Sequence, residues 1–205
     1  YKPVHWCLDC QSALAEAEVE YIDKTSTSVD VLFSVADISD FIERTKSKII
    51  DNEAQLYIPI WTTTPWTLPS NEAVAMGKDI NYAIFKAKLN ERDILVIIAN
   101  DLQESIASRW GVEKLDKLEE VSAENLFGLQ LQHPFDQRTV PVLLGDHVTT
   151  ENGTGSVHTA PAHGHEDFYL GKENDLDLNC YVNTYGVFAE AKESFANQHI
   201  FKSES

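Results

Sequence analysis

The sequence predicts a mainly β domain with helices packed around it, in the α+β class. Short apolar or alternating runs of four to eight residues recur between turn residues, which is typical of many short strands. Three or four short amphipathic segments indicate peripheral helices. A regular strand–helix repeat is absent, and no glycine-rich nucleotide-binding motif follows any strand. Because no linker or repeat divides the 205 residues, we expect a single domain over 1–205.

Four elements are expected in the first third of the chain. Residues 18–23 and 28–35 alternate polar and apolar side chains, which predicts an antiparallel hairpin. Residues 39–49 are expected to form a short helix with Ser39 as its N-cap. An apolar run over 56–60 predicts a buried strand.

The later elements follow the same signals. The helix over 100–110 is the clearest, because Leu102, Ile106 and Trp110 share one face and Gly111 can end it. Strands are expected at 72–75, 81–88, 93–99, 129–133, 138–144 and 178–182, and helical turns at 121–127 and 166–174.

Composition limits the classes of function. The net charge is −17, from 33 acidic and 16 basic residues, which argues against a general nucleic-acid binder. Three cysteines, an odd number, favour reduced thiols. We see no apolar run of about 18 residues and no secretory signal, and therefore expect a cytoplasmic protein, or one of an organelle matrix.

A threonine triplet follows the expected strand at 56–60. Thr62, Thr63 and Thr64 stand between two tryptophans, and Pro65 and Pro69 fix the backbone that follows. A stiff, hydroxyl-rich loop at a strand end suits binding of a small molecule. The alternative is that the threonines only extend a β-branched strand.

A second block, 153–167, carries His158 and Asp167 among glycines. Gly153, Gly155 and Gly164 permit close backbone approach around them. Asp167 falls in the first turn of the expected helix, where the helix dipole stabilises a carboxylate by about 0.3–1 kcal/mol. Taken alone, the aspartate could serve only this purpose, and the histidine could be a satisfied core residue.

These two blocks, WTTTPWTLPSN and GTGSVHTAPAHGHED, together with the opening YKPVHWC, resemble the editing (CP1) domain of isoleucyl-tRNA synthetases, a class I family. In the related valyl and leucyl editing domains an arginine stands at the position of Thr64. The resemblance implies a closed β-barrel core of the ValRS/IleRS/LeuRS editing type. It also implies that residues 1–20 and roughly 185–205 lie near the junctions with the synthetase core.

The resemblance further implies hydrolysis of misacylated tRNA, chiefly Val-tRNA(Ile). Asp167 would hold the α-ammonium group, His158 would contact the amino-acid side chain, and Thr62–Thr64 would line the opposite wall. The remaining expected substrate contacts are Trp66, Thr67, Thr159, Gly155 and Ala160. The expected partners are the 3′ end of tRNA(Ile), valine or a similar small amino acid, and the rest of the synthetase chain. The acidic charge fits this role if other domains hold the tRNA body.

The chain contains neither the HIGH nor the KMSKS signature, so we expect it not to activate amino acids, and ATP binding belongs to the full-length enzyme. No cofactor or metal is expected in the editing site. Cys7 and Cys10 form a CxxC, which we interpret as half of a zinc site completed outside the chain, because a structural zinc needs four ligands. Otherwise they are ordinary cysteines.

Two rival hypotheses remain. His158, His163, His165 and Asp167 provide four potential metal ligands within ten residues, which would suit a metal-dependent hydrolase. Phe168 stands where an extended metal motif would place another histidine, and the editing family does not use a metal here. The second rival is a non-catalytic binding module, which the presence of both motif blocks argues against.

Overall fold

The structure is a computed structural model that describes residues 2–23, 25–51, 53–90, 92–190 and 195–202. Its contacts group the chain into two compact units. The sheet unit comprises Val29–Thr62 and Ala73–His158, and the loop unit comprises Tyr1–Ser28, Thr63–Glu72 and Thr159–Ser205. The expectation of a single domain over 1–205 stays a prediction.

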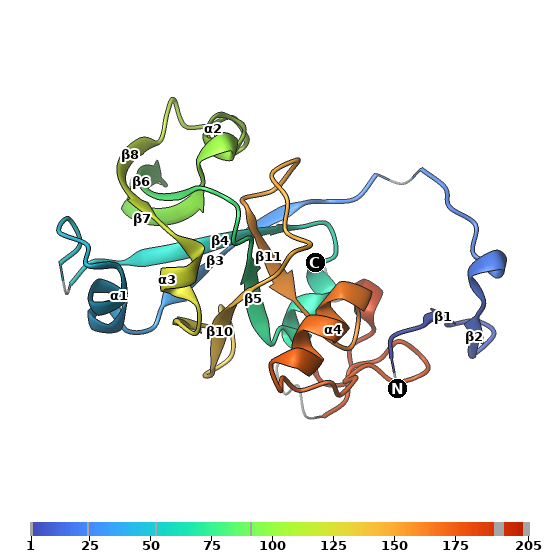
Figure 1. Ribbon diagram of the computed structural model, residues 1–205. Coiled ribbons are helices and arrows are strands. Elements are labelled where there is room, and N and C mark those ends of the chain that lie inside the picture. The colour runs from blue at the N-terminus through green and yellow to red at the C-terminus, as the bar shows by residue number, and fades with distance from the viewer. Residues whose placement is uncertain (1, 24, 52, 91, 191–194, 203–205) are drawn as a thin grey trace. The chain divides into compact units, whose positions relative to one another are not determined.

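The sheet unit is built on nine strands in the order β11-β5-β10-β9-β3-β4-β7-β6-β8. All of them except β9 are labelled in Figure 1. Their bounds are β3 Val29–Val35, β4 Leu56–Thr62, β5 Ala73–Met76, β6 Tyr82–Leu89, β7 Arg92–Ala99, β8 Asp116–Val121, β9 Gln130–Gln132, β10 Thr139–Leu144 and β11 Ser156–Thr159. Most pairs are antiparallel, whereas β4–β7 and β5–β10 are parallel. The mainly β fold with helices is therefore confirmed.

Strand β4 lies centrally between β3 and β7, and its sequence explains how far each pairing extends. It pairs with β3 from Ser34↔Tyr57 to Val29↔Thr62. Its pairing with β7 covers only Leu56 and Tyr57. Pro59 follows, and proline has no N–H to donate to a ladder. The Pro59 carbonyl instead accepts a hydrogen bond from Thr154 Oγ1 at 2.6 Å.

Three α-helices accompany these strands: α1 Ile38–Thr45, α2 Gln103–Trp110 and α3 Ala123–Leu126. The expected cap of α1 was wrong by two residues. Asp37, rather than Ser39, caps the helix, because its Oδ1 accepts from the backbone N–H groups of Ser39 and Asp40 at 2.8 and 3.2 Å.

The expected helix at 100–110 begins as a 3₁₀ turn, η3 Asn100–Leu102, before α2. It ends where predicted, since Gly111 adopts the left-handed conformation with φ 65°.

The expected hairpin of 18–23 with 28–35 was also wrong. Strand β3 pairs instead with β4 and β9, and residues 19–23 carry no strand assignment. Alternation identifies a half-buried strand, but not its partner. Strand β8 was not predicted, because most of its residues are charged.

The closed barrel is not confirmed. Among the described strands, β11 and β8 stand at the two ends of an open order. Strand β8 pairs with β6 through an irregular register between Ile84 and Phe85. Asp116, Lys117 and Glu120 are exposed along it, a pattern typical of an edge strand.

The loop unit contains shorter elements: β1 His5–Cys7, β2 Ser12–Leu14, η1 Glu16–Glu18, η2 Pro65–Ser70, α4 His165–Glu173 and η5 Ile200–Lys202. β1 and β2 form an antiparallel hairpin. The strand expected at 178–182 was wrong, because only Val182 makes an isolated bridge, to Phe188. Within the described residues, no helix combines the length and apolar composition that a membrane span requires.

Candidate active site

The threonine triplet divides at the end of a strand. Thr62 is the last residue of β4, whereas Thr63 and Thr64 lie outside the strand and lead into η2. Pro65 occupies the start of η2, where its missing N–H costs nothing. Thr67 then donates from its N–H and its Oγ1 to the Thr64 carbonyl, at 3.1 and 2.9 Å. The prediction that the chain leaves the strand in a turn is confirmed for Thr63 and Thr64, whereas Thr62 extends the strand.

The same unit joins this turn to the second motif block. The Glu72 N–H, just after η2, donates to the Thr159 carbonyl at 2.9 Å. The rings of Trp66 and His163 meet edge to face, with centroids 5.1 Å apart. The structure therefore brings together two stretches that lie about ninety residues apart in the sequence.

Asp167 closes the turn between β11 and α4. Its Oδ2 accepts a hydrogen bond from the Ala160 N–H at 2.9 Å, while the N–H groups of His163 and Gly164 donate to the Ala160 carbonyl at 2.9 and 3.3 Å. As expected, Asp167 lies in the first turn of α4. The carboxylate is therefore held on a rigid turn rather than at the end of a mobile side chain.

Gly164 lets this carboxylate approach the backbone. A Cβ atom at this position would lie 2.8 Å from Asp167 Oδ2 and 3.0 Å from its Cγ, closer than nonbonded atoms approach. The sequence predicts close backbone approach at this glycine, but not which group approaches it.

Two buried hydroxyls lie near the same segments. Thr159 is fully buried and Ser70 nearly so, and neither side-chain oxygen has a hydrogen-bond partner among the described residues. A buried polar atom without a partner is uncommon, and an ordered water or a ligand usually satisfies it. The substrate contact expected of Thr159 stays a prediction. Ser70 was not predicted as a site residue.

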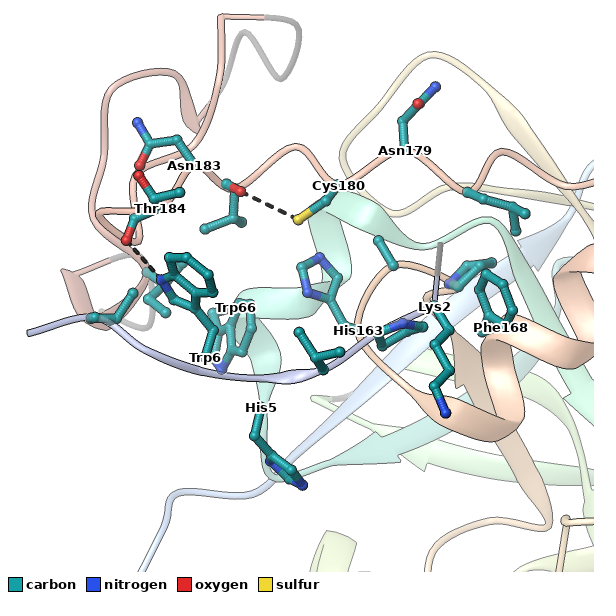
Figure 2. A pocket seen from close by; sticks show the side chains of 18 of the residues that line it. Lys2, His5, Trp6, Trp66, His163, Phe168, Asn179, Cys180, Asn183 and Thr184 are labelled. Atoms are coloured by element: carbon teal, nitrogen blue, oxygen red, sulfur yellow. Dashed lines mark hydrogen bonds between the residues drawn. The ribbon is translucent and has the colours of Figure 1, made fainter. Parts of the chain in front are cut away.

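The imidazole of His163 packs against the ring of Trp66 (Figure 2). Burial lowers the pKa of its imidazole to about 4, so the ring is neutral near pH 7. His165, two residues later, is exposed. In the described part of the chain, no three His, Cys, Asp or Glu side chains are grouped so that they could hold a metal ion. The arrangement gives no support to the metal-dependent rival.

Three expected site residues belong to the sheet unit. Thr62 in β4 and His158 in β11 are both about nine-tenths buried. Gly155 has φ +83°, its carbonyl accepts from the Tyr82 hydroxyl, and a Cβ there would lie 2.5 Å from Ala99 Cβ. Gly155 thus has a packing role that the sequence did not reveal. The substrate contacts expected of all three stay predictions.

The CxxC forms a tight turn at the end of β1. The Cys10 N–H donates to Cys7 Sγ at 3.3 Å, and this hydrogen bond lowers the pKa of the Cys7 thiol. The Cys7 side chain in turn raises the pKa of Cys10. Two thiols supply half the ligands of a structural zinc site, so the half-site interpretation stays a prediction.

Comparison with known proteins points to one family. The family model for the editing domain of leucyl-tRNA synthetase matches residues 48–203. The chain is 44% identical over 203 residues to the isoleucine--tRNA ligase of Francisella philomiragia and 46% identical over 202 residues to that of Coxiella burnetii. These matches cover 99% and 98% of this chain but only 21% of each relative. The chain thus spans about a fifth of the length of these relatives.

Solved structures show the same fold at low sequence identity. The crystal structure of GlLeuRS-CP1 gives a TM-score of 0.65 at 13% identity, covering 87% of this chain and 93% of that one. The P. falciparum cytosolic leucyl-tRNA synthetase editing domain gives a TM-score of 0.61 at 11% identity, covering 72% and 67%.

Proposed function

Because the chain belongs to the editing-domain family of class I aminoacyl-tRNA synthetases, and resembles its isoleucyl members over nearly its whole length, we propose that it hydrolyses misacylated tRNA, chiefly Val-tRNA(Ile). The observation that carries the proposal is the placement of Asp167. Its carboxylate accepts a hydrogen bond from the Ala160 N–H. The hydrogen bond between Glu72 and Thr159 joins this turn to the segment that follows Thr63, Thr64 and η2.

In this proposal Asp167 binds the α-ammonium group of the esterified amino acid. A charge-assisted hydrogen bond of this kind is shorter and about twice as strong as a neutral one. The contact is shared by every α-amino acid, so Asp167 secures the substrate without selecting its side chain. Thr63 and Thr64, together with Thr62, would supply hydroxyls for the carbonyl group and the terminal adenosine.

Water is the proposed nucleophile. Its oxygen adds to the ester carbonyl carbon, the bond between that carbon and the ribose oxygen breaks, and a proton from the water passes to the departing ribose oxygen, which leaves as a hydroxyl. The products are free valine and tRNA(Ile). Threonine hydroxyls and the neighbouring ribose hydroxyl would orient the water, so no covalent enzyme intermediate is required.

Selectivity would come from size. A missing methylene changes binding in an apolar pocket by only about 1–3 kcal/mol, a limit for which the isoleucine–valine pair is the standard example. A second pocket that admits valine and excludes isoleucine removes the error that the first pocket lets through. We assign the size limit to His158, which the resemblance places against the amino-acid side chain. The 3′ end of the tRNA and the remaining synthetase domains are the proposed partners, with both ends of the chain near the junctions.

The test separates the charge of Asp167 from its structural hydrogen bond. Asp167→Asn keeps an oxygen that can accept from the Ala160 N–H, whereas Asp167→Ala removes the acceptor. Both variants, in the full-length ligase, should hydrolyse Val-tRNA(Ile) at least about ten- to a hundred-fold more slowly, because a hydrogen bond to a charged group is lost. Only Asp167→Ala should also lower the melting temperature.

His165→Ala, which alters an exposed side chain two residues away, is the matched control and should keep wild-type hydrolysis. Near wild-type hydrolysis by Asp167→Asn would remove the ammonium contact from the mechanism.

A further inference from the structure

Residues 153–155 lead directly into β11, the strand of the sheet unit that carries His158. Their backbone is bonded to other strands of the same unit. The N–H of Ala99, the last residue of β7, donates to the Thr154 carbonyl at 3.0 Å, and the next carbonyl along the chain accepts from the Tyr82 hydroxyl of β6. Strand β11 therefore starts from a backbone that is fixed within the sheet unit.

The Thr154 side chain joins this segment to β4. Thr154 is fully buried, and its Oγ1 donates to the Pro59 carbonyl at 2.6 Å. The same oxygen accepts a hydrogen bond from the N–H of Ser156, the first residue of β11, at 3.3 Å. One hydroxyl thus links the strand that ends at Thr62 to the strand that carries His158.

The position of Thr154 follows from the short pairing between β4 and β7. That pairing covers Leu56 and Tyr57 and stops before Pro59, which has no N–H to donate. Beyond this point Thr154 bonds to both strands, because its carbonyl accepts from Ala99 in β7 and its hydroxyl donates to Pro59 in β4. Thr154 therefore holds β4 and β7 together where their own ladder has ended.

Arg109, near the end of α2, anchors the same segment to β3. Its Nε and Nη2 donate to the two carboxylate oxygens of Asp30 at 2.7 and 2.9 Å, and Nη2 also donates to the Gly153 carbonyl at 3.1 Å. A planar guanidinium bound at two oxygens has a defined orientation. Asp30 lies opposite Trp61, one residue before Thr62, in the pairing of β3 with β4.

We propose that Thr154 and Arg109 are positioning residues that maintain the size limit of the editing site by fixing β11, and with it His158. The inference rests on the proposed function, in which His158 excludes isoleucine. Isoleucine exceeds valine by a single methylene, so a limit based on size holds only while the limiting side chain stays in place. A displacement of about 1 Å can change an enzymatic rate about a hundredfold, even when the altered residue is far from the chemistry.

Deacylation by the full-length ligase tests the inference with Thr154→Val, which keeps the branched shape of the side chain and removes the hydroxyl. The ratio of kcat/KM for Ile-tRNA(Ile) to that for Val-tRNA(Ile) should rise at least about tenfold, which is the lower end of what one methylene contributes to discrimination. Thr154→Ser retains the hydroxyl and should restore the wild-type ratio. Thr139→Val, the same change at an exposed threonine of β10, is the matched control and should leave the ratio and the melting temperature unchanged.

Combination with His158→Ala distinguishes positioning from a general loss of stability. If Thr154 acts through His158, adding Thr154→Val to His158→Ala should change the Ile/Val ratio no further, because residues that act together are not additive. Additive changes in the ratio would overturn the inference. An unchanged ratio in Thr154→Val would also overturn it, whatever the melting temperature of that variant.

Arg109→Met decides the question if Thr154→Val does not fold. Arg109 is an exposed residue of a helix, and methionine is a good helix former of similar length, so this variant should fold. It should raise the Ile/Val ratio by about two- to thirtyfold, the range expected of residues that act on a site through others. A wild-type ratio in folded Arg109→Met would overturn the inference.

The proposed function and this inference fail in different ways. A wild-type ligase that cleaves neither aminoacyl-tRNA would overturn both. Selective cleavage of Val-tRNA(Ile) by the wild type, with the same Ile/Val ratio in Thr154→Val, would leave the proposed function standing and overturn only the positioning role.

Discussion

Replacing His163 by phenylalanine should make the stability of the chain less sensitive to acid. The wild-type imidazole has its ordinary pKa of 6.5 in the unfolded chain, and burial lowers the value to about 4 in the folded chain. Between these two values the unfolded state binds a proton that the folded state does not. Unfolding therefore becomes more favourable as the pH falls through this window.

The magnitude follows from the two pKa values. A tenfold change in proton affinity corresponds to about 1.4 kcal/mol. Between about pH 7 and pH 4.5, most of the proton-binding difference is expressed, so His163 should lower the free energy of unfolding by roughly 2 kcal/mol. Phenylalanine keeps a ring that can contact Trp66 but has no proton to bind.

Urea denaturation at the two pH values measures this directly. Between the higher and the lower pH, the unfolding free energy of the wild type should fall by roughly 2 kcal/mol more than that of His163→Phe. His165→Phe, which replaces an exposed imidazole nearby, controls for general effects of losing a histidine. Parallel pH dependences for wild type and His163→Phe would refute the reasoning that burial keeps this ring neutral.

Three further changes test other parts of the structure. Gly155→Ala should destabilise the chain by about 2–4 kcal/mol, because it combines a positive φ with a Cβ 2.5 Å from that of Ala99; an unchanged melting temperature would contradict this. Gly164→Ala should displace the Asp167 carboxylate and slow Val-tRNA(Ile) hydrolysis more than it lowers the melting temperature, and normal hydrolysis would show that the carboxylate position is not critical. His158→Ala should let the full-length ligase cleave Ile-tRNA(Ile), and an unaltered Val/Ile ratio in the deacylation assay would exclude His158 from the size limit.

Local signals in the sequence predicted where strands form better than which strands pair with each other. The apolar run at 56–60 and the alternation at 28–35 both became strands, β4 and β3. Their pairing with each other joins residues about thirty positions apart, whereas β9, the other partner of β3, lies about a hundred residues along the chain. Such long-range pairing depends on how whole strands bury their faces, which a short window of sequence does not contain.

The same holds for the candidate site, where the sequence identified residues but not the contacts that hold them. The motif blocks pointed to Asp167 and the threonines, but the resemblance rather than periodicity supplied their roles. What fixes Asp167 is a hydrogen bond from the Ala160 backbone, and backbone groups look alike at every position of a sequence. The pocket of the loop unit that Figure 2 shows was not predicted for a similar reason, since its walls come from the N-terminal segment around Trp6, the turn carrying Trp66 and His163, and residues 178–184.

Strand β8 forms one edge of the open sheet. Lys117 and Glu120 pair with each other along this strand at 2.8 Å, and Asp116 stands exposed beside them. A strand from another molecule that docked here would have to strip water from these charges and follow the irregular register that β8 shares with β6. We therefore expect β8 to resist edge-to-edge pairing between copies of the chain at concentrations where an apolar edge strand of regular register would promote aggregation.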